Sequence, residues 1–185
     1  TDYLDFSETS AGETWTVRVT PNDGYEDGSY TESSITIENS EPTISSVSIT
    51  PNSSVYNDSV LSCSATASDE DETVTPTYEW TVGSNSYSGA SLDLATTSAL
   101  PTDVITCTAT VTDSASSSVT DSTSVTLENR SPTVSSVGIT PNTVYSSDTV
   151  TCSSTVADAD GESVTPTYEW SVSGTIVGTD ASLTL

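Results

Sequence analysis

The feature that most constrains this chain is that it repeats itself after 90 residues. Residues 42–47 recur with one conservative change at 132–137, and residues 75–80 recur unchanged at 165–170. The spacing between Cys63 and Cys152 is one residue shorter than this period. The acidic loop that follows Cys152 is one residue longer than the loop that follows Cys63, which restores the period. Self-similarity at a fixed period indicates a repeated structural unit. We therefore expect residues 1–41 to be the second half of one repeat, 42–131 a complete repeat and 132–185 the first half of a third.

Within the complete repeat, apolar and polar residues alternate, which is the pattern of strands with one buried face. Short alternating stretches are separated by turn residues such as Pro51-Asn52 and Asp113-Ser114. Six or seven short strands in about 90 residues predict a β-sandwich. The fold class expected is therefore all-β, with sandwich domains of about 90 residues arranged end to end.

Two cysteines fall on the inward phase of separate predicted strands. Cys63 and Cys107 flank Trp80, the Cys…Trp…Cys order of an immunoglobulin-like (Ig-like) core. We expect a disulfide between them; the alternative is a pair of buried free thiols in a reducing compartment. Cys152 has no partner within the chain, because the strand expected to carry one would lie beyond Leu185. In the first half-repeat Val17 takes the position of Cys107, so no bridge is expected there.

The charge of the chain excludes several classes of function. It has 2 Lys+Arg against 27 Asp+Glu and no histidine, for a net charge of −25. A nucleic-acid partner needs basic side chains, and an anionic membrane surface would repel this chain. No apolar run has the length of a membrane-spanning helix. The usual general base is missing as well, so we expect a non-enzymatic protein that inserts into no membrane.

Several motifs resemble the Ig-like and PKD-like tandem repeats of large bacterial or archaeal cell-surface proteins and adhesins. The resemblance rests on the linker 38–43, the turn 50–52, the core pattern of Cys63 with 77–80, and residues 15–17 with 20–24. It implies a secreted or cell-surface location, a role in adhesion, spacing or filament building, and no catalysis. The expected function is a stiff spacer in a long extracellular filament, stalk or adhesin. Its partners would be neighbouring repeats of the chain or neighbouring copies in a filament.

Three acidic loops are candidates for calcium, because Ca²⁺ prefers several hard oxygen ligands. The alternative for each loop is a solvated turn on an acidic protein. The candidate ligands are Asp69 and Asp71, then Asp158, Asp160 and Glu162, and in the first part Asp23 and Asp27. No other cofactor is expected.

Asparagines at three positions lie in glycosylation triplets, in predicted turns or a linker. They are Asn52, Asn57 and Asn129. A chain rich in serine and threonine also produces such triplets by chance, so glycosylation and chance both remain open.

Both predicted linkers, 38–42 and 128–132, are short and end in proline. Proline favours an extended chain, so neighbouring domains should stand end to end with little bending. The two half-repeats have two explanations: the polypeptide continues in a longer protein, or subunits complete each other head to tail. In the second case Cys152 would face Val17 and stay free.

Two other functions remain open. One is an adhesin that binds glycan or protein through its loops, for which Tyr25, Tyr30, Tyr56 and Tyr87 are candidates. The other is a spacer that calcium stiffens, which a calcium-dependent melting temperature would reveal.

Overall fold

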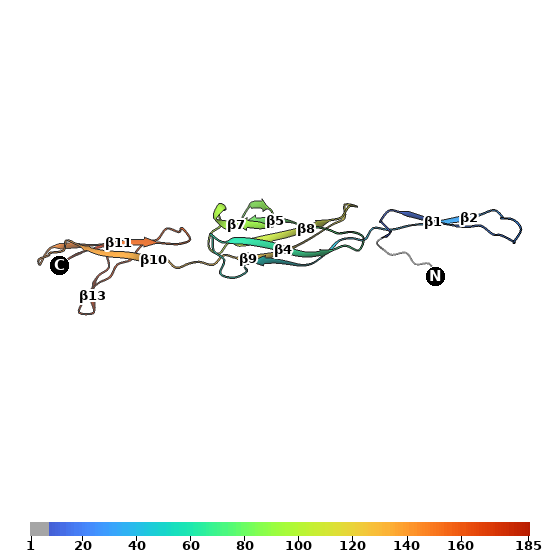
Figure 1. Ribbon diagram of the computed structural model, residues 1–185. Coiled ribbons are helices and arrows are strands. Elements are labelled where there is room, and N and C mark those ends of the chain that lie inside the picture. The colour runs from blue at the N-terminus through green and yellow to red at the C-terminus, as the bar shows by residue number, and fades with distance from the viewer. Residues whose placement is uncertain (1–7) are drawn as a thin grey trace.

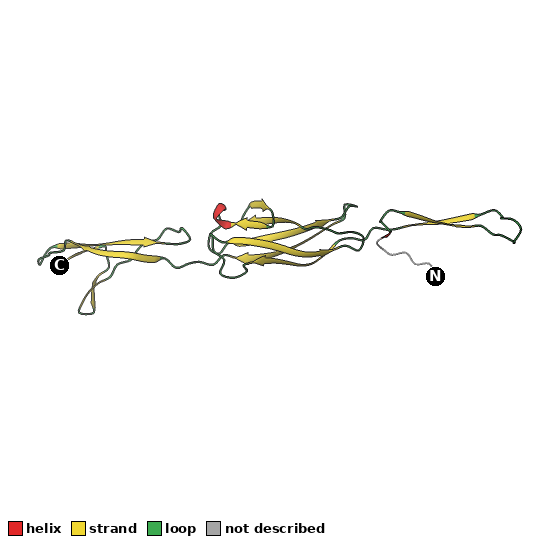
Figure 2. Ribbon diagram, viewed as in Figure 1, coloured by secondary structure: helices red, strands yellow, loops and turns green. Residues whose placement is uncertain are grey.

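The computed structural model describes residues 8–185; residues 1–7, part of the predicted first half-repeat, lie outside it. The described chain is all-β, with several antiparallel sheets and a short 3-10 turn at Leu94–Thr96. Three parts lie in a row, with strands β1 and β2 at one end and β10 to β14 at the other (Figure 1). Figure 2 shows that strands and loops account for almost the whole ribbon.

The N-terminal part is a two-stranded hairpin. Strand β1 (Thr14–Val19) pairs with β2 (Thr31–Thr36), with Trp15 opposite Ile35 and Val17 opposite Ser33. Every residue of both strands is exposed. An isolated hairpin has no second layer against which to bury its apolar side chains.

The central part consists of two sheets. The first has the order β3 (Thr43–Thr50), β4 (Val60–Ser68), β7 (Ser91–Asp93). The second has the order β6 (Asn85–Ser88), β5 (Thr77–Val82), β8 (Val104–Thr112), β9 (Ser118–Thr126). Alternate residues of β8 are buried, as the period of two in the sequence predicts.

Buried residues from both sheets form one hydrophobic cluster in this part. Trp80 is fully buried, and its Nε1 donates to the carbonyl of Gly89 at 2.8 Å. The predicted disulfide joins Cys63 on β4 to Cys107 on β8, so it crosses from one sheet to the other. The rest of the cluster comes from alternating strand positions and adjoining loops: Ile49, Val55, Leu61, Val82, Leu92, Leu94, Ala99, Ile105, Val125 and Leu127. The central part is therefore sandwich-like, with its core between two sheets.

The C-terminal part contains a three-stranded sheet and a separate hairpin. The sheet order is β10 (Thr133–Thr140), β11 (Thr149–Ala157), β14 (Ser182–Thr184). The hairpin joins β12 (Trp170–Val172) to β13 (Thr175–Gly178). All residues of β10 are exposed.

Strand register repeats with the same period as the sequence. Ile49 lies opposite Cys63 on β3–β4, and Ile139 lies opposite Cys152 on β10–β11. Both pairs of strands shift register at equivalent places, after Ile44 and after Val134. The β1–β2 pairing reproduces that of β8–β9, in which Ile105 lies opposite Val125. The N-terminal hairpin thus has the strand pairing of β8–β9, and the C-terminal sheet has that of β3, β4 and β7.

Candidate functional site

Hydrogen-bonded polar side chains lie at the two junctions between the parts. At each junction an asparagine side chain forms a hydrogen bond with the linker backbone at the next residue. Asn39 Nδ2 donates to the carbonyl of Ser40 at 2.7 Å, and Asn129 Nδ2 donates to the carbonyl of Arg130 at 3.0 Å. These bonds, together with the following prolines, restrict the conformations of the linker.

The same linker residues are anchored to the part that follows. The backbone N–H of Ser40 donates to Asp71 Oδ2 at 2.5 Å, and that of Arg130 donates to Asp160 Oδ2 at 2.6 Å. A hydrogen bond to a carboxylate is stronger than one between neutral groups. Both junctions therefore use one device, repeated along the chain.

The acceptor loops have the same local structure. The N–H of Asp71 donates to Asp69 Oδ1 at 2.7 Å, and the N–H of Asp160 donates to Asp158 Oδ1 at 2.7 Å. Each is an Asx-type turn, in which a carboxylate bonds to the backbone two residues ahead. Both loops belong to the set predicted to bind calcium, and here they hold the linkers.

Arg130 makes the second junction more extensive than the first. Its Nε donates to Asp160 Oδ1 at 2.9 Å, Nη1 to Asp58 Oδ2 at 3.0 Å, and Nη2 to Asn57 Oδ1 at 3.1 Å. The guanidinium also lies 4.8 Å from the centre of the Tyr56 ring. Since 56–58 belong to the central part and Asp160 to the C-terminal part, Arg130 ties the two together.

The charge on Asp160 is stabilised by this arrangement. Its side chain is buried, and the backbone N–H and guanidinium of Arg130 hold the pKa of the carboxyl below its ordinary value. Asp58 and Asp160 in turn raise the pKa of Arg130. A buried carboxylate is tolerated because it is both paired and hydrogen-bonded.

The first junction uses a different buried acid. Asn39 Nδ2 donates to Asp113 Oδ2 at 2.9 Å, and Asp113 Oδ1 accepts the N–H of Ser117 at 2.7 Å. The Asn39 bond is the main reason that the pKa of the buried Asp113 is lowered. The N-terminal hairpin is thus linked to two loops of the central part.

Calcium ligation stays a prediction, and the three acidic loops offer it different geometries. One ligand atom from each of Asp158, Asp160 and Glu162 lies within 4.8 Å of the others. Both oxygens of Asp160 already accept hydrogen bonds from Arg130. At Asp69, Oδ2 is buried without a hydrogen-bond partner, while Oδ1 accepts the N–H of Asp71. The Asp71 carboxylate in turn accepts the N–H of Ser40 in the first junction.

The third loop lies at the far end of the N-terminal hairpin. Asp23 Oδ1 accepts the N–H groups of Tyr25 and Glu26, which lower the pKa of Asp23. Asp27 Oδ1 accepts Asn22 Nδ2 at 2.6 Å. Asp23 and Asp27 therefore close the turn between β1 and β2.

The three glycosylation candidates differ in access. Asn52 is exposed on its loop. Asn57 Nδ2 donates to the carbonyl of Asp160 at 2.6 Å, and Asn129 Nδ2 is bonded within its linker. A glycan on Asn57 would replace a junction contact, so Asn52 is the position most compatible with this structure.

The four candidate binding tyrosines do not gather at one end. Tyr25 and Tyr30 are exposed on the N-terminal hairpin, where Arg18 stacks on the Tyr30 ring at 4.2 Å. Tyr56 contacts Arg130, and Tyr87 packs against the central core.

Sequence reasoning missed the roles of Arg130, Asp58, Asn39 and Asp113. A signal was present in the repeat itself. Asp69 and Asp71 are separated from Asp158 and Asp160 by the same spacing as Cys63 and Cys152, and only two basic residues occur in the chain, one of them in a linker.

Comparison of the chain with protein-family models, curated proteins and solved structures finds no match. Among residues 8–185, no helix combines the length and apolar character needed to cross a membrane.

Proposed function

We propose that this chain is a non-enzymatic structural segment of a long extracellular filament, stalk or surface adhesin, in which Ig-like sandwiches of about 90 residues stand end to end as a stiff spacer. The observation that carries the proposal is the junction. A spacer transmits position only if its joints resist bending, and both joints here are short, proline-ended and bonded to a carboxylate of the next part.

The second junction supports stiffness most directly. Arg130 reaches Asp58 on one side and Asp160 on the other, so bending at this joint would separate charged groups from their partners. Removing one partner of a buried charge leaves the other uncompensated, which opposes such bending.

An extracellular location is supported by the cross-sheet disulfide. Disulfides persist in oxidising compartments and are rare where glutathione keeps thiols reduced. The high acidity agrees with a secreted surface that stays soluble through charge repulsion.

Small-angle X-ray scattering of the whole chain tests the proposal. Strand β8 has 9 residues, about 30 Å at ~3.3 Å per residue, so three parts in a row should measure roughly 100 Å. We expect a rod-like profile at infinite dilution, and a more flexible profile for Arg130→Ala.

Arg18→Ala is the matched control, since Arg18 pairs with Glu32 inside one hairpin and not across a junction. Circular dichroism would check that both variants keep their strand content. A compact wild-type particle, or an Arg130→Ala profile identical to that of the wild type, would overturn the stiff-spacer proposal.

The adhesin alternative has one observation in its favour. Tyr25 is 96% exposed in the turn of the N-terminal hairpin, so its ring is accessible to a ligand. Binding of the chain to a glycan array, lost in Tyr25→Ala, would favour that function.

A further inference from the structure

Two apolar faces at opposite ends of the molecule lack a covering layer within the described residues. On the N-terminal hairpin, Trp15, Val17 and Ile35 are 42%, 59% and 70% exposed. On the C-terminal sheet, Val134, Val137 and Ile139 are more than half exposed. Adjacent exposed apolar side chains on a sheet face indicate an interaction surface.

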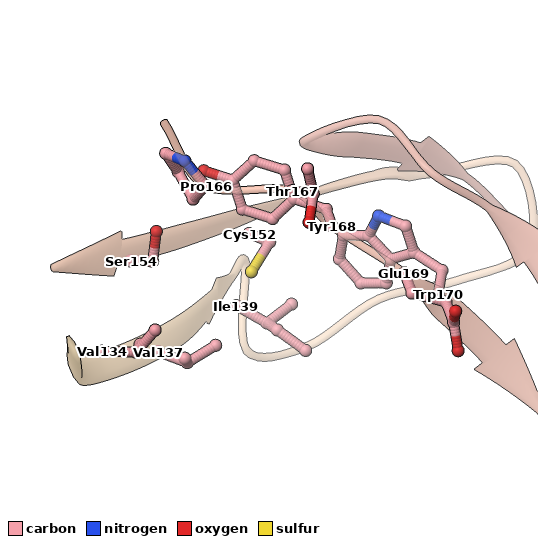
Figure 3. Close-up of a pocket in the computed structure, with 10 residues that line it drawn as sticks. All are labelled: Val134, Val137, Ile139, Cys152, Ser154, Pro166, Thr167, Tyr168, Glu169 and Trp170. Carbon is pink, nitrogen blue, oxygen red and sulfur yellow. The ribbon is translucent and has the colours of Figure 1, made fainter. Parts of the chain in front are cut away.

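The C-terminal face is an open groove with Cys152 on its floor. Figure 3 shows the Cys152 sulfur among Ile139, Tyr168 and Trp170, with Val134 and Val137 farther along the same face. These residues are the repeat equivalents of Ile49, Tyr78 and Trp80, all of which belong to or pack against the central core. In the central part that face is covered by β8 and β9.

The N-terminal hairpin resembles strands β8 and β9, which cover the equivalent face in the central part. Trp15, Val17 and Ile35 stand one period before Ile105, Cys107 and Val125, which are three of the buried residues of β8 and β9. The cross-strand pairing is also the same, since Trp15 lies opposite Ile35 as Ile105 lies opposite Val125.

We propose that the β1–β2 hairpin of one copy of this chain docks on the β10–β14 face of a second copy, completing a sandwich between them. In this complex Val17 takes the place of Cys107 and lies over Cys152. The chain cannot make the same contact with itself, because the central part separates the two faces (Figure 1). A head-to-tail contact between different surfaces gives an open filament unless the rotation between copies closes a ring, and the arrangement of the three parts in a row favours the open form.

Charge complementarity supports this occupant. In the central part, Glu79 on β5 lies opposite Thr108 on β8. The equivalents at the composite interface are Glu169 of one copy and Arg18 of the other. One of only two basic residues in the chain would therefore lie opposite a carboxylate on the incoming strand.

A polar contact would also be restored at the linker. Asn39 donates to Asp113 at the first junction. At the composite interface Asn129 of one copy is the equivalent of Asn39, and Asp23 of the other copy is the equivalent of Asp113. The docked hairpin would bring Asp23, in its turn, to the linker of the second copy.

Cysteine cross-linking tests the register directly. Val17→Cys in the whole chain, purified reduced and then oxidised, should form a ladder of disulfide-linked multimers through Cys152 on a non-reducing gel. The geometry required is that of Cys63 and Cys107, whose Cα atoms are 6.5 Å apart.

Two controls identify the bond. Thr16→Cys places the thiol on the opposite face of β1, and Val17→Cys with Cys152→Ser removes the acceptor. We expect at least tenfold less multimer from each. Equal cross-linking in all three variants, or none in Val17→Cys, would overturn the proposal.

A second variant leaves both apolar faces and all cysteines unchanged. Glu169→Arg opposes Arg18 and should weaken association, measured by sedimentation of the reduced chain, by about two- to fivefold. Glu79→Arg makes the same charge change opposite Thr108 and should leave association unchanged. Equal effects of the two variants would contradict this interface.

The proposal goes beyond the spacer function and fails separately from it. A chain that stays monomeric but scatters as a stiff rod would overturn the docking and leave the spacer intact. A flexible chain whose Val17→Cys variant still forms the multimer ladder through Cys152 would overturn the spacer function and leave the docking intact.

Discussion

At the scale of single residues, the Cys63–Cys107 disulfide is the strongest local constraint. It joins positions 44 residues apart, on strands of the two facing sheets. Closing a loop of this length removes conformational freedom from the unfolded chain, for a stabilisation of about 4 kcal/mol in the chain-entropy account.

Replacing both cysteines by alanine should therefore lower the free energy of unfolding of the central part by about 3–4 kcal/mol. The measurement is urea unfolding followed by the fluorescence of Trp80, the buried tryptophan. Cys152→Ala is the control, because Cys152 forms no disulfide in the structure. A double-variant loss below about 1 kcal/mol would be inconsistent with this account.

Asp113 gives the first junction a dependence on pH. Its pKa is lowered, chiefly by the Asn39 bond, so the carboxylate is the form that the folded state prefers. A lowered folded pKa means that the stabilisation is present above the unfolded pKa, near 4, and is lost as pH falls through the folded pKa.

The melting temperature of the wild type should exceed that of Asp113→Asn at pH 5–7, and the difference should shrink below pH 4. Exposed Asp121→Asn removes the same charge away from any junction and should show no such trend. A difference that persisted undiminished at pH 2.5 would show that the ionised carboxylate is not the cause.

At the scale of elements, residues 165–170 show that a neighbouring strand decides whether a segment becomes a strand. They are identical to 75–80. In the central part the strand begins at Thr77 and pairs with β8, whereas in the C-terminal part it begins only at Trp170. Backbone groups become a strand when another strand satisfies their hydrogen bonds, and β12 has no such neighbour at 167–169 among the described residues.

Hydrogen exchange should detect completion of this strand. If the proposed docking occurs, amides of 167–169 should exchange quickly in dilute protein and at least tenfold more slowly at high concentration. The identical residues of β5, Thr77 to Glu79, serve as an internal control and should be protected at both concentrations. Unchanged exchange at 167–169 across the association range would contradict docking by strand addition.

At this scale most strands of the complete repeat followed from alternation, and the Cys63–Cys107 pair followed from the inward phase of both cysteines and the Cys…Trp…Cys order. Strand β6 (Asn85–Ser88) was not predicted, because its sequence is polar and lies beside an expected turn. The junction contacts did not. Asp58, Asp113 and Asp160 look alike in a chain with 27 acidic residues, and which of them are buried depends on loops that meet only in three dimensions.

At the scale of the whole molecule, net charge opposes the association of copies. Each chain carries −25, and the repulsion between copies is long-ranged at low salt, where screening extends over about 30 Å at 0.01 M. Raising the salt concentration shortens that range, while docking of Trp15, Val17 and Ile35 rests on apolar contact.

Association should therefore strengthen between 0.01 M and 0.5 M NaCl, measured by sedimentation of the reduced wild-type chain. Glu169→Arg should retain this trend at weaker affinity. Association that weakened steadily with salt would indicate that the Arg18–Glu169 attraction outweighs the repulsion between whole chains.

The amino-acid sequence by itself determined the period of 90 residues, the all-β class, the strand phase and the disulfide, because these depend on local alternation and on spacing along the chain. Only the tertiary structure decided which acidic loops bind the linkers, that Arg130 joins two parts, and that 165–170 differs from its identical copy. Those outcomes depend on which groups lie beside one another in space, where burial and an available hydrogen-bond partner outweigh local preference.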